Sequence, residues 1–124
     1  MLPIDHDLEV LARLMQNAPY PVVICNAEGH VVSANDAARS FYGKPRNGTA
    51  SKNWTGVAEV RDESGRALQP DEYPLNRALS GQVVNDEPFT VVHSGTGQTR
   101  KIRVTAHQLR DGNRLIGAVT IHRD

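Results

Sequence analysis

The first segment of the chain repeats hydrophobic residues at the spacing of an amphipathic helix. The repeat runs through positions i, i+3, i+4 and i+7 at Leu8, Leu11, Ala12 and Met15. Asp5 or Asp7 can cap its start, because a short acidic side chain accepts hydrogen bonds from the free amides of the first turn. Pro19 should end it, since proline lacks the amide hydrogen that a helix needs. We therefore expect a helix within residues 1–17.

Two short apolar segments, both rich in β-branched residues, follow this helix. They cover residues 21–25 and 30–34. The intervening residues 26–29, Asn-Ala-Glu-Gly, have turn chemistry, because asparagine and glycine tolerate the backbone angles of a tight reversal. Two such segments around a turn predict an antiparallel hairpin. If the side chains alternate, Val23 and Cys25 face the interior.

The middle of the chain carries shorter and weaker signals. Asn35 or Asp36 can cap a short helix through Phe41. Residues 44–52 are polar and rich in turn formers, which predicts a loop. Further along, Pro70 and two acidic residues precede an apolar set, and Gly81 follows as a stop. This pattern predicts one helix of about ten residues.

Three segments of strand character close the chain, at residues 83–93, 99–109 and 115–122. The second alternates, with Ile102, Val104 and Ala106 on one face and Lys101, Arg103 and Thr105 on the other. Such alternation is typical of an antiparallel strand that is solvated on one side. The whole pattern predicts an α+β domain: a five-stranded antiparallel sheet with helices on one face and an N-terminal amphipathic helix.

Length, composition and charge narrow the class of protein. The chain has 124 residues, of which 39% are hydrophobic and 23% charged, which indicates one globular domain. Fourteen basic residues balance fourteen acidic ones, so no net field attracts nucleic acid or an anionic membrane. The single cysteine, Cys25, fits a reducing compartment. The acidic start and the lack of a long apolar run favour a cytoplasmic domain without signal peptide or anchor.

Several of these segments resemble the PAS family, over about residues 17–124. The hairpin carries Val22-Val23-Ile24-Cys25-Asn26, Glu28-Gly29 and His30-Val31-Val32-Ser33-Ala34-Asn35. The later helix and its glycine stop, Asp71-Glu72-Tyr73-Pro74-Leu75-Asn76-Arg77-Ala78-Leu79-Ser80-Gly81-Gln82, resemble those of PAS domains in bacterial sensor kinases. The last two strands resemble the family at Gln108-Leu109-Arg110-Asp111, Gly117-Ala118-Val119 and His122-Arg123-Asp124.

The resemblance implies a PAS domain over residues 18–124, with strand order 2-1-5-4-3 and a small pocket between sheet and helices. It also implies a sensory role in bacterial two-component signal transduction, in a sensor histidine kinase or a related protein. Such a module binds a small ligand or a partner and passes the change to a C-terminal effector domain. Residues 1–17 would then be a flanking helix that serves as a homodimer contact.

The resemblance and the alternation together select candidates for lining a ligand pocket: Val23, Cys25, Phe41, Tyr42, Trp54, Tyr73, Asn76, Phe89, Ile102, Val104, Ala106 and Val119. A pocket is mostly apolar with a few polar groups. The same aromatic residues would equally serve to fill a core, so both interpretations stay open. Asn76 and Arg77 share a helix, and whichever turns inward can meet a hydrogen-bonding or carboxylate ligand. Arg77 is expected to be solvated.

Haem and flavin are both disfavoured as cofactors. Light-sensing flavin relatives carry their cysteine in an Asn-Cys-Arg-Phe-Leu-Gln stretch, which this chain lacks. Haem-binding relatives place a histidine on the helix that corresponds to residues 71–80, and no histidine stands there. Cys25 is interpreted as a plain buried thiol. The histidines have spacings that do not suit a metal site and are expected at surface or strand positions: His6, His30, His93, His107 and His122.

No catalytic framework is recognisable in the sequence. Neither a nucleophile with its base nor a pair of carboxylates stands in a known arrangement, so no residue is assigned to catalysis and the domain is not expected to be an enzyme. Two alternatives remain. One is a ligandless PAS dimerisation scaffold. The other is a small cone-shaped α+β isomerase or hydratase, which would need long helices ahead of the sheet and a strand order other than 2-1-5-4-3.

Overall fold

The structure is a computed structural model that describes residues 6–42, 58–93 and 97–123 of the chain. Its helical elements are α1 (His6–Met15), α2 (Asp36–Tyr42), the 3-10 turn η2 (Pro70–Glu72) and α3 (Pro74–Leu79). Its strands are β1 (Val22–Asn26), β2 (Val31–Ala34), β3 (Ala58–Arg61), β4 (Val84–His93), β5 (Thr99–Asp111) and β6 (Arg114–Arg123). Helix, hairpin, short helix and three late strands stand in the predicted order.

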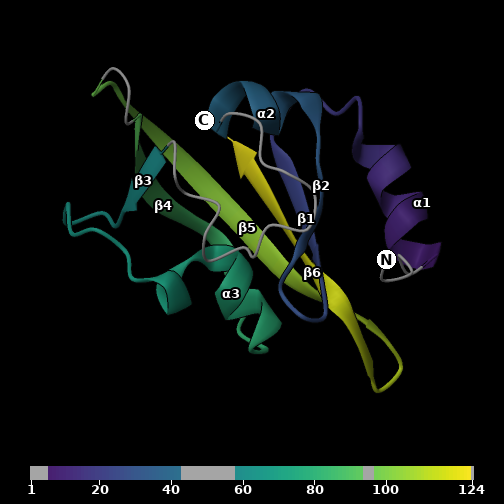
Figure 1. Ribbon diagram of the computed structural model, residues 1–124. Coiled ribbons are helices and arrows are strands. Elements are labelled where there is room, and N and C mark those ends of the chain that lie inside the picture. The colour runs from purple at the N-terminus through teal and green to yellow at the C-terminus, as the bar shows by residue number, and fades with distance from the viewer. Residues whose placement is uncertain (1–5, 43–57, 94–96, 124) are drawn as a thin grey trace.

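All the strands join one antiparallel sheet in the order β2-β1-β6-β5-β4-β3 (Figure 1). The predicted order is confirmed, because the predicted strands 2-1-5-4-3 correspond to the first five positions. The predicted number of strands is wrong, since β3 adds a sixth strand beyond β4. β3 is only four residues long, and Val60, opposite Val91, is its one buried side chain among those described. So short an edge strand leaves little hydrophobic pattern in a sequence.

The predicted helix around residues 70–80 is interrupted. Tyr73 separates η2 from α3 and has an extended backbone, with φ −63° and ψ 138°. The cause is Pro74, because the ring of a proline disfavours the helical conformation in the residue before it. The predicted glycine stop is confirmed: Gly81 follows α3 with φ 95°, and its amide donates to the carbonyl of Ala78.

The two faces of the sheet are covered by different helices. The inner face, which carries Cys25 and Ile102, forms one buried cluster with Ala38 of α2 and with Leu75 and Ala78 of α3. The outer face, which carries Val22 and Ile24, forms a second cluster with α1. Figure 1 shows α1 beside β1 and β2, away from α3. β1 is therefore buried on both of its faces, between α1 on one side and the inner cluster on the other.

Asn35 connects the two layers at the edge of the sheet. Its side-chain oxygen accepts hydrogen bonds from the amides of Val22, at 3.0 Å, and Ala38, at 2.9 Å, so that it caps α2 as predicted. Its side-chain nitrogen donates to the carbonyls of Met15 and Tyr20, at 3.0 and 2.9 Å. Only 1% of Asn35 is exposed. One buried amide thus joins the end of α1, the start of β1 and the start of α2.

Candidate functional site

The inner face gathers most of the residues that the sequence places in a pocket. Six of them are buried in its cluster, namely Val23, Cys25, Phe89, Ile102, Val104 and Ala106, and Tyr73 packs against that cluster. The alternation of β5 directs its three members to this face. Pairing with β4 brings Phe89 opposite Ile102, and paired residues in antiparallel strands share a face.

Small side chains occupy much of the inner face. Ala106 of β5 and Ala118 of β6 are fully buried, and so are Ala38 of α2 and Ala78 of α3. Side chains without bulk allow the helices to lie close to the strands, and α3 contacts both β5 and β6. A shift of α3 would therefore be felt directly by the two central strands.

Other predicted pocket residues lie elsewhere. The prediction that Val119 lines the same pocket as Cys25 is wrong. Val119 lies opposite Ile24 and packs in the outer cluster, because its neighbour Ala118 is the residue that faces inward. Asn76 donates to the carbonyl of Pro70 at 2.7 Å in an exposed contact, so the amide fixes η2 against α3. The side chains of Phe41 and Tyr42, and all of Trp54, lie outside the described residues.

Cys25 is a buried thiol at the centre of the inner cluster. It is fully buried, and burial raises its pKa to about 12. A thiol that keeps its proton at neutral pH is a poor nucleophile and a poor metal ligand. The expected burial of Cys25 is confirmed.

His122 is a buried polar residue that the sequence did not single out. It is 6% exposed and lies opposite the inward-facing Val104, in the strand register of β5 and β6. Burial lowers its pKa to about 3, because the charged imidazolium cannot be hydrated there. His122 is therefore neutral at physiological pH. The signal that could have found it is its even spacing from Ala118, a buried residue of the same strand.

A small cavity lies at one end of the inner face, beside His122. Its volume is about 150 Å³, and its lining includes Tyr20, Arg100, Ile102 and His122. Ligand pockets commonly measure about 300–1,000 Å³, so this cavity suits only a very small molecule.

Arg77 forms the main ionic contact between α3 and the sheet. Its guanidinium donates two hydrogen bonds to the carboxylate of Glu87 on β4, at 3.0 and 3.1 Å, and a third to Gln82, at 3.1 Å. The expectation that Arg77 is solvated is wrong, since only 23% of its side chain is exposed. Neither Glu87 nor this pairing was visible in the sequence, because the two partners lie ten residues apart on different elements.

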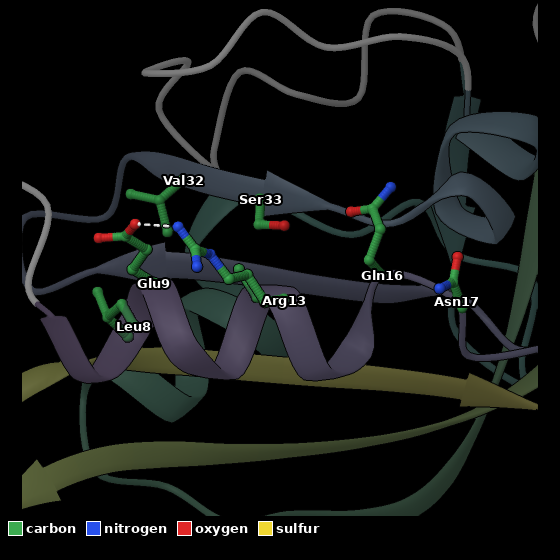
Figure 2. Close-up of a pocket in the computed structure, with 8 residues that line it drawn as sticks. Leu8, Glu9, Arg13, Gln16, Asn17, Val32 and Ser33 are labelled. Atoms are coloured by element: carbon green, nitrogen blue, oxygen red, sulfur yellow. Dashed lines mark hydrogen bonds and ion pairs between the residues drawn. The ribbon is translucent and has the colours of Figure 1, made fainter.

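A larger groove lies on the outer side, between α1 and β2 (Figure 2). Its volume is about 430 Å³. Leu8, Ala12 and Val32 contribute apolar lining, while Glu9 and Arg13 form an ion pair of 2.9 Å at its border. α1 also exposes two apolar side chains one turn apart, Val10 at 42% and Leu14 at 70%. Val10 and Leu14 do not line the groove and form a separate exposed apolar surface on α1, of a kind typical of contact surfaces.

A polar cluster lies on the outer face, over β4, β5 and β6. Asp86 accepts hydrogen bonds from Arg103 at 3.0 Å and from Arg123 at 2.7 and 2.9 Å. These contacts, that of Arg123 first, lower the pKa of Asp86. Arg123 is the last residue of β6, so the cluster holds that end of the strand.

Within residues 6–42, 58–93 and 97–123, no three His, Cys, Asp or Glu side chains gather in a way that could hold a metal ion. No helix in these ranges is long and apolar enough to cross a membrane.

Comparisons with known proteins agree with this architecture. Residues 15–124 match a family model described as PAS fold. The PAS domain of BvgS from Bordetella pertussis aligns with a TM-score of 0.65 and 18% identity, covering 97% of this chain and 87% of that one. The PAS domain of nitrogen regulation protein NR(II) from Vibrio parahaemolyticus gives 0.58 and 18%, covering 93% and 97%.

A domain of a sensory box sensor histidine kinase/response regulator from Geobacter sulfurreducens gives a TM-score of 0.56 and 22% identity, covering 95% of this chain and 94% of that one. At such identities these neighbours show the fold alone. No curated protein matches the chain significantly.

Proposed function

The chain belongs to the PAS family, and from that premise we propose that it is a sensory domain of a larger bacterial signal transduction protein, such as a sensor histidine kinase. A small ligand or a partner would act on the inner face, and the change would pass through the end of β6 to a C-terminal output domain. The resemblance of the fold to PAS domains of bacterial signalling proteins supports this proposal.

The position of β6 is the observation that carries the proposal. β6 lies between β1 and β5, contributes the buried Ala118, Thr120 and His122 to the inner side, and contacts α3. The same strand ends at Arg123. A displacement of α3 therefore acts on the strand that leads toward the C-terminus. The mechanism is a shift between two packings, driven by the difference in ligand affinity for each.

Native mass spectrometry tests this function. The chain is purified from a bacterial cytoplasm without denaturation, and a retained small molecule of constant mass is the expected result. The Ala106→Leu variant fills the inner face and should lose the molecule. His107→Leu is the matched control, because His107 is the exposed neighbour on the same strand, and it should retain the molecule. A protein without any bound molecule would contradict ligand sensing.

A ligandless dimerisation scaffold is the second candidate function. The observation that favours it is the dense inner cluster, in which buried side chains from sheet and helices already contact one another. A clean apo dimer in the same mass spectrum would support the scaffold. The isomerase or hydratase alternative is not supported, because the strand order is that of the PAS fold. We assign no residue to catalysis.

Homodimerisation through α1 is part of the proposal. Val10 and Leu14 are the exposed apolar residues of α1, and a symmetric dimer would remove them from water. Leu14→Glu should convert the dimer to a monomer in analytical ultracentrifugation. Val83→Glu is the control, because Val83 is 64% exposed but lies after α3 rather than on α1. Equal association of both variants would contradict a dimer through α1.

The cellular setting follows from composition. We place the domain in the cytoplasm, where a reducing environment keeps Cys25 as a thiol. Its neutral net charge gives no reason to assign nucleic acid or a membrane surface as a partner.

A further inference from the structure

Asp86 has an unusual backbone conformation for a residue inside a strand. Its φ is 53°, and it is the only residue other than glycine with a positive φ in the described part of the chain. This left-handed region is unfavourable for residues with a side chain, although aspartate tolerates it better than most. Asp86 lies where the pairing of β4 with β5 shifts register, between Val84 and Glu87. β4 therefore contains a bulge at this residue.

On the outer face, every polar group of Asp86 has a partner. Besides the contacts of its carboxylate, the carbonyl oxygen of Asp86 accepts a hydrogen bond from Arg103 at 2.7 Å. Its amide donates to the hydroxyl of Thr105 at 3.1 Å. The bulge of β4 is thus fixed to β5 and to the end of β6.

On the inner side, the next residue of the bulge binds α3. Glu87 pairs with Val104 in the register of β4 and β5 and accepts both hydrogen bonds from Arg77. On the other side of the bulge, Val84 is fully buried in the inner cluster. Adjacent residues of one bulge therefore contact α3 on the inner face and Arg123 on the outer face.

Stability alone does not explain this arrangement. Asp86 is in an unfavourable conformation, and the side chains that hold it there are exposed: 38% for Asp86, 45% for Arg103 and 61% for Arg123. Exposed ion pairs contribute little to folding. A strained residue persists where the surrounding contacts determine its conformation, and such residues are common in switch regions.

We propose that the β4 bulge at Asp86 and Glu87 couples the position of α3 on the inner face to the end of β6 on the outer face. When Arg77 holds Glu87, the bulge keeps Asp86 in its left-handed conformation and the carboxylate holds Arg123. When α3 shifts and Glu87 is released, Asp86 relaxes to an extended conformation and frees Arg123. This inference rests on the proposed function, because it names the route by which an inner-face change reaches the C-terminal end.

Amide hydrogen exchange in the chain of residues 1–124 tests the coupling. The probe is the terminal segment of β6, residues 121–123, and the internal reference is the amide of the fully buried Cys25, which lies in β1 opposite Ala118. Glu87→Gln weakens the contact with Arg77 and should raise exchange of the terminal segment roughly threefold to tenfold relative to Cys25. The ratio to Cys25 separates this effect from a loss of global stability, which accelerates both.

Glu59→Gln is the matched control. Glu59 forms an ion pair of 3.1 Å with Arg61 within the neighbouring strand β3, and its exposure is similar to that of Glu87. It lies opposite Val92, five residues along β4 from Glu87. Exchange of residues 121–123 relative to Cys25 should stay unchanged in this variant. If Glu87→Gln also leaves that ratio unchanged, the coupling is refuted and the Arg77–Glu87 pair serves only to hold α3.

Asp86→Gly tests the order of the steps. Glycine accepts the left-handed conformation but removes the carboxylate, so the terminal segment should exchange faster, as in Glu87→Gln. Adding Glu87→Gln to Asp86→Gly should then have no further effect. A full additional effect would show that Glu87 acts on β6 by another route and would overturn the proposal. Native mass spectrometry stays independent, because loss of this coupling does not affect whether a molecule is retained.

Discussion

The inner and the outer face of the sheet differ in how far their hydrophobic surface extends. On the inner face it runs from Val23 of β1 across to Val60 of β3, beneath α2 and α3. On the outer face it lies near α1, whereas β5 presents Lys101, Arg103 and His107 to solvent. The same strands form both faces. Whether a position in this sheet carries an apolar or a polar side chain therefore depends on what covers that face, and not on the strand to which the position belongs.

β1 and β5 show this difference within single strands. β1 has four consecutive buried residues, because α1 and the inner cluster cover it on opposite sides. β5 alternates over Lys101–Ala106, because only its inner side is covered there. A continuous apolar run in this sheet therefore marks a strand between two layers, and an alternating run marks one between a layer and water.

Substitution on opposite faces of β5 should have the largest contrast. Ile102→Ala removes a side chain that is 3% exposed and leaves a cavity in the inner cluster, so we expect a loss of about 3 kcal/mol in unfolding free energy. Lys101→Ala changes the preceding residue, whose side chain is exposed on the opposite face. It should change the unfolding free energy by less than about 0.5 kcal/mol. Urea unfolding followed by circular dichroism measures both. Equal losses would contradict the assignment of the faces.

The junction of the two layers should be nearly as sensitive. Asn35→Ala removes the cap of α2 and leaves the carbonyls of Met15 and Tyr20 without this donor, so we expect a loss of about 2 to 3 kcal/mol. Asn35→Ser retains a hydroxyl that can cap Ala38 and should recover about 1 kcal/mol. The same unfolding assay applies. A neutral Asn35→Ala variant would show that α1 and α2 are held independently.

Acid should destabilise the protein through His122. Its folded-state pKa of about 3 lies below the ordinary value of 6.5, so the unfolded chain takes up the proton first as the pH falls. Stability is full above about pH 7 and should drop by about 2 kcal/mol between pH 8 and pH 5. The lowered pKa values of Asp86 and Glu72 affect stability only below about pH 5, where the carboxylates of the unfolded chain begin to take up protons. His122→Gln should flatten the curve above pH 5, and an unchanged slope would contradict the burial of a neutral imidazole.

Local patterns predicted much of this fold. The hairpin of β1 and β2, the alternation of β5 and the glycine stop of α3 were all visible, because each depends on residues close in sequence. Pro74 was also visible, but the apolar pattern on both sides of it indicated one continuous helix and not a break at Tyr73. The strand order came from the resemblance to a family.

Contacts between distant segments could not be predicted. The burial of His122 depends on its register with Val104, and the pairing of Arg77 with Glu87 depends on where α3 crosses β4. Val119 was placed on the wrong face because β6 has buried residues on both sides, so hydrophobicity does not identify the phase of its alternation. Asp86 carries no sequence signal, since its conformation follows from a bulge.

The central claim is that α3 on the inner face is coupled to the end of β6, whereas α1 on the outer face is not. Matched substitutions in these two helices test it. Ala78 of α3 is fully buried against the inner face, and Ala12 of α1 packs on the outer face. Hydrogen exchange of His122 and Arg123, relative to Cys25, should rise in Ala78→Val and stay unchanged in Ala12→Val. Ile121 is left out of this comparison, because it packs in the same outer cluster as Ala12. A rise in Ala12→Val alone, or the same rise in both variants, would contradict the claim.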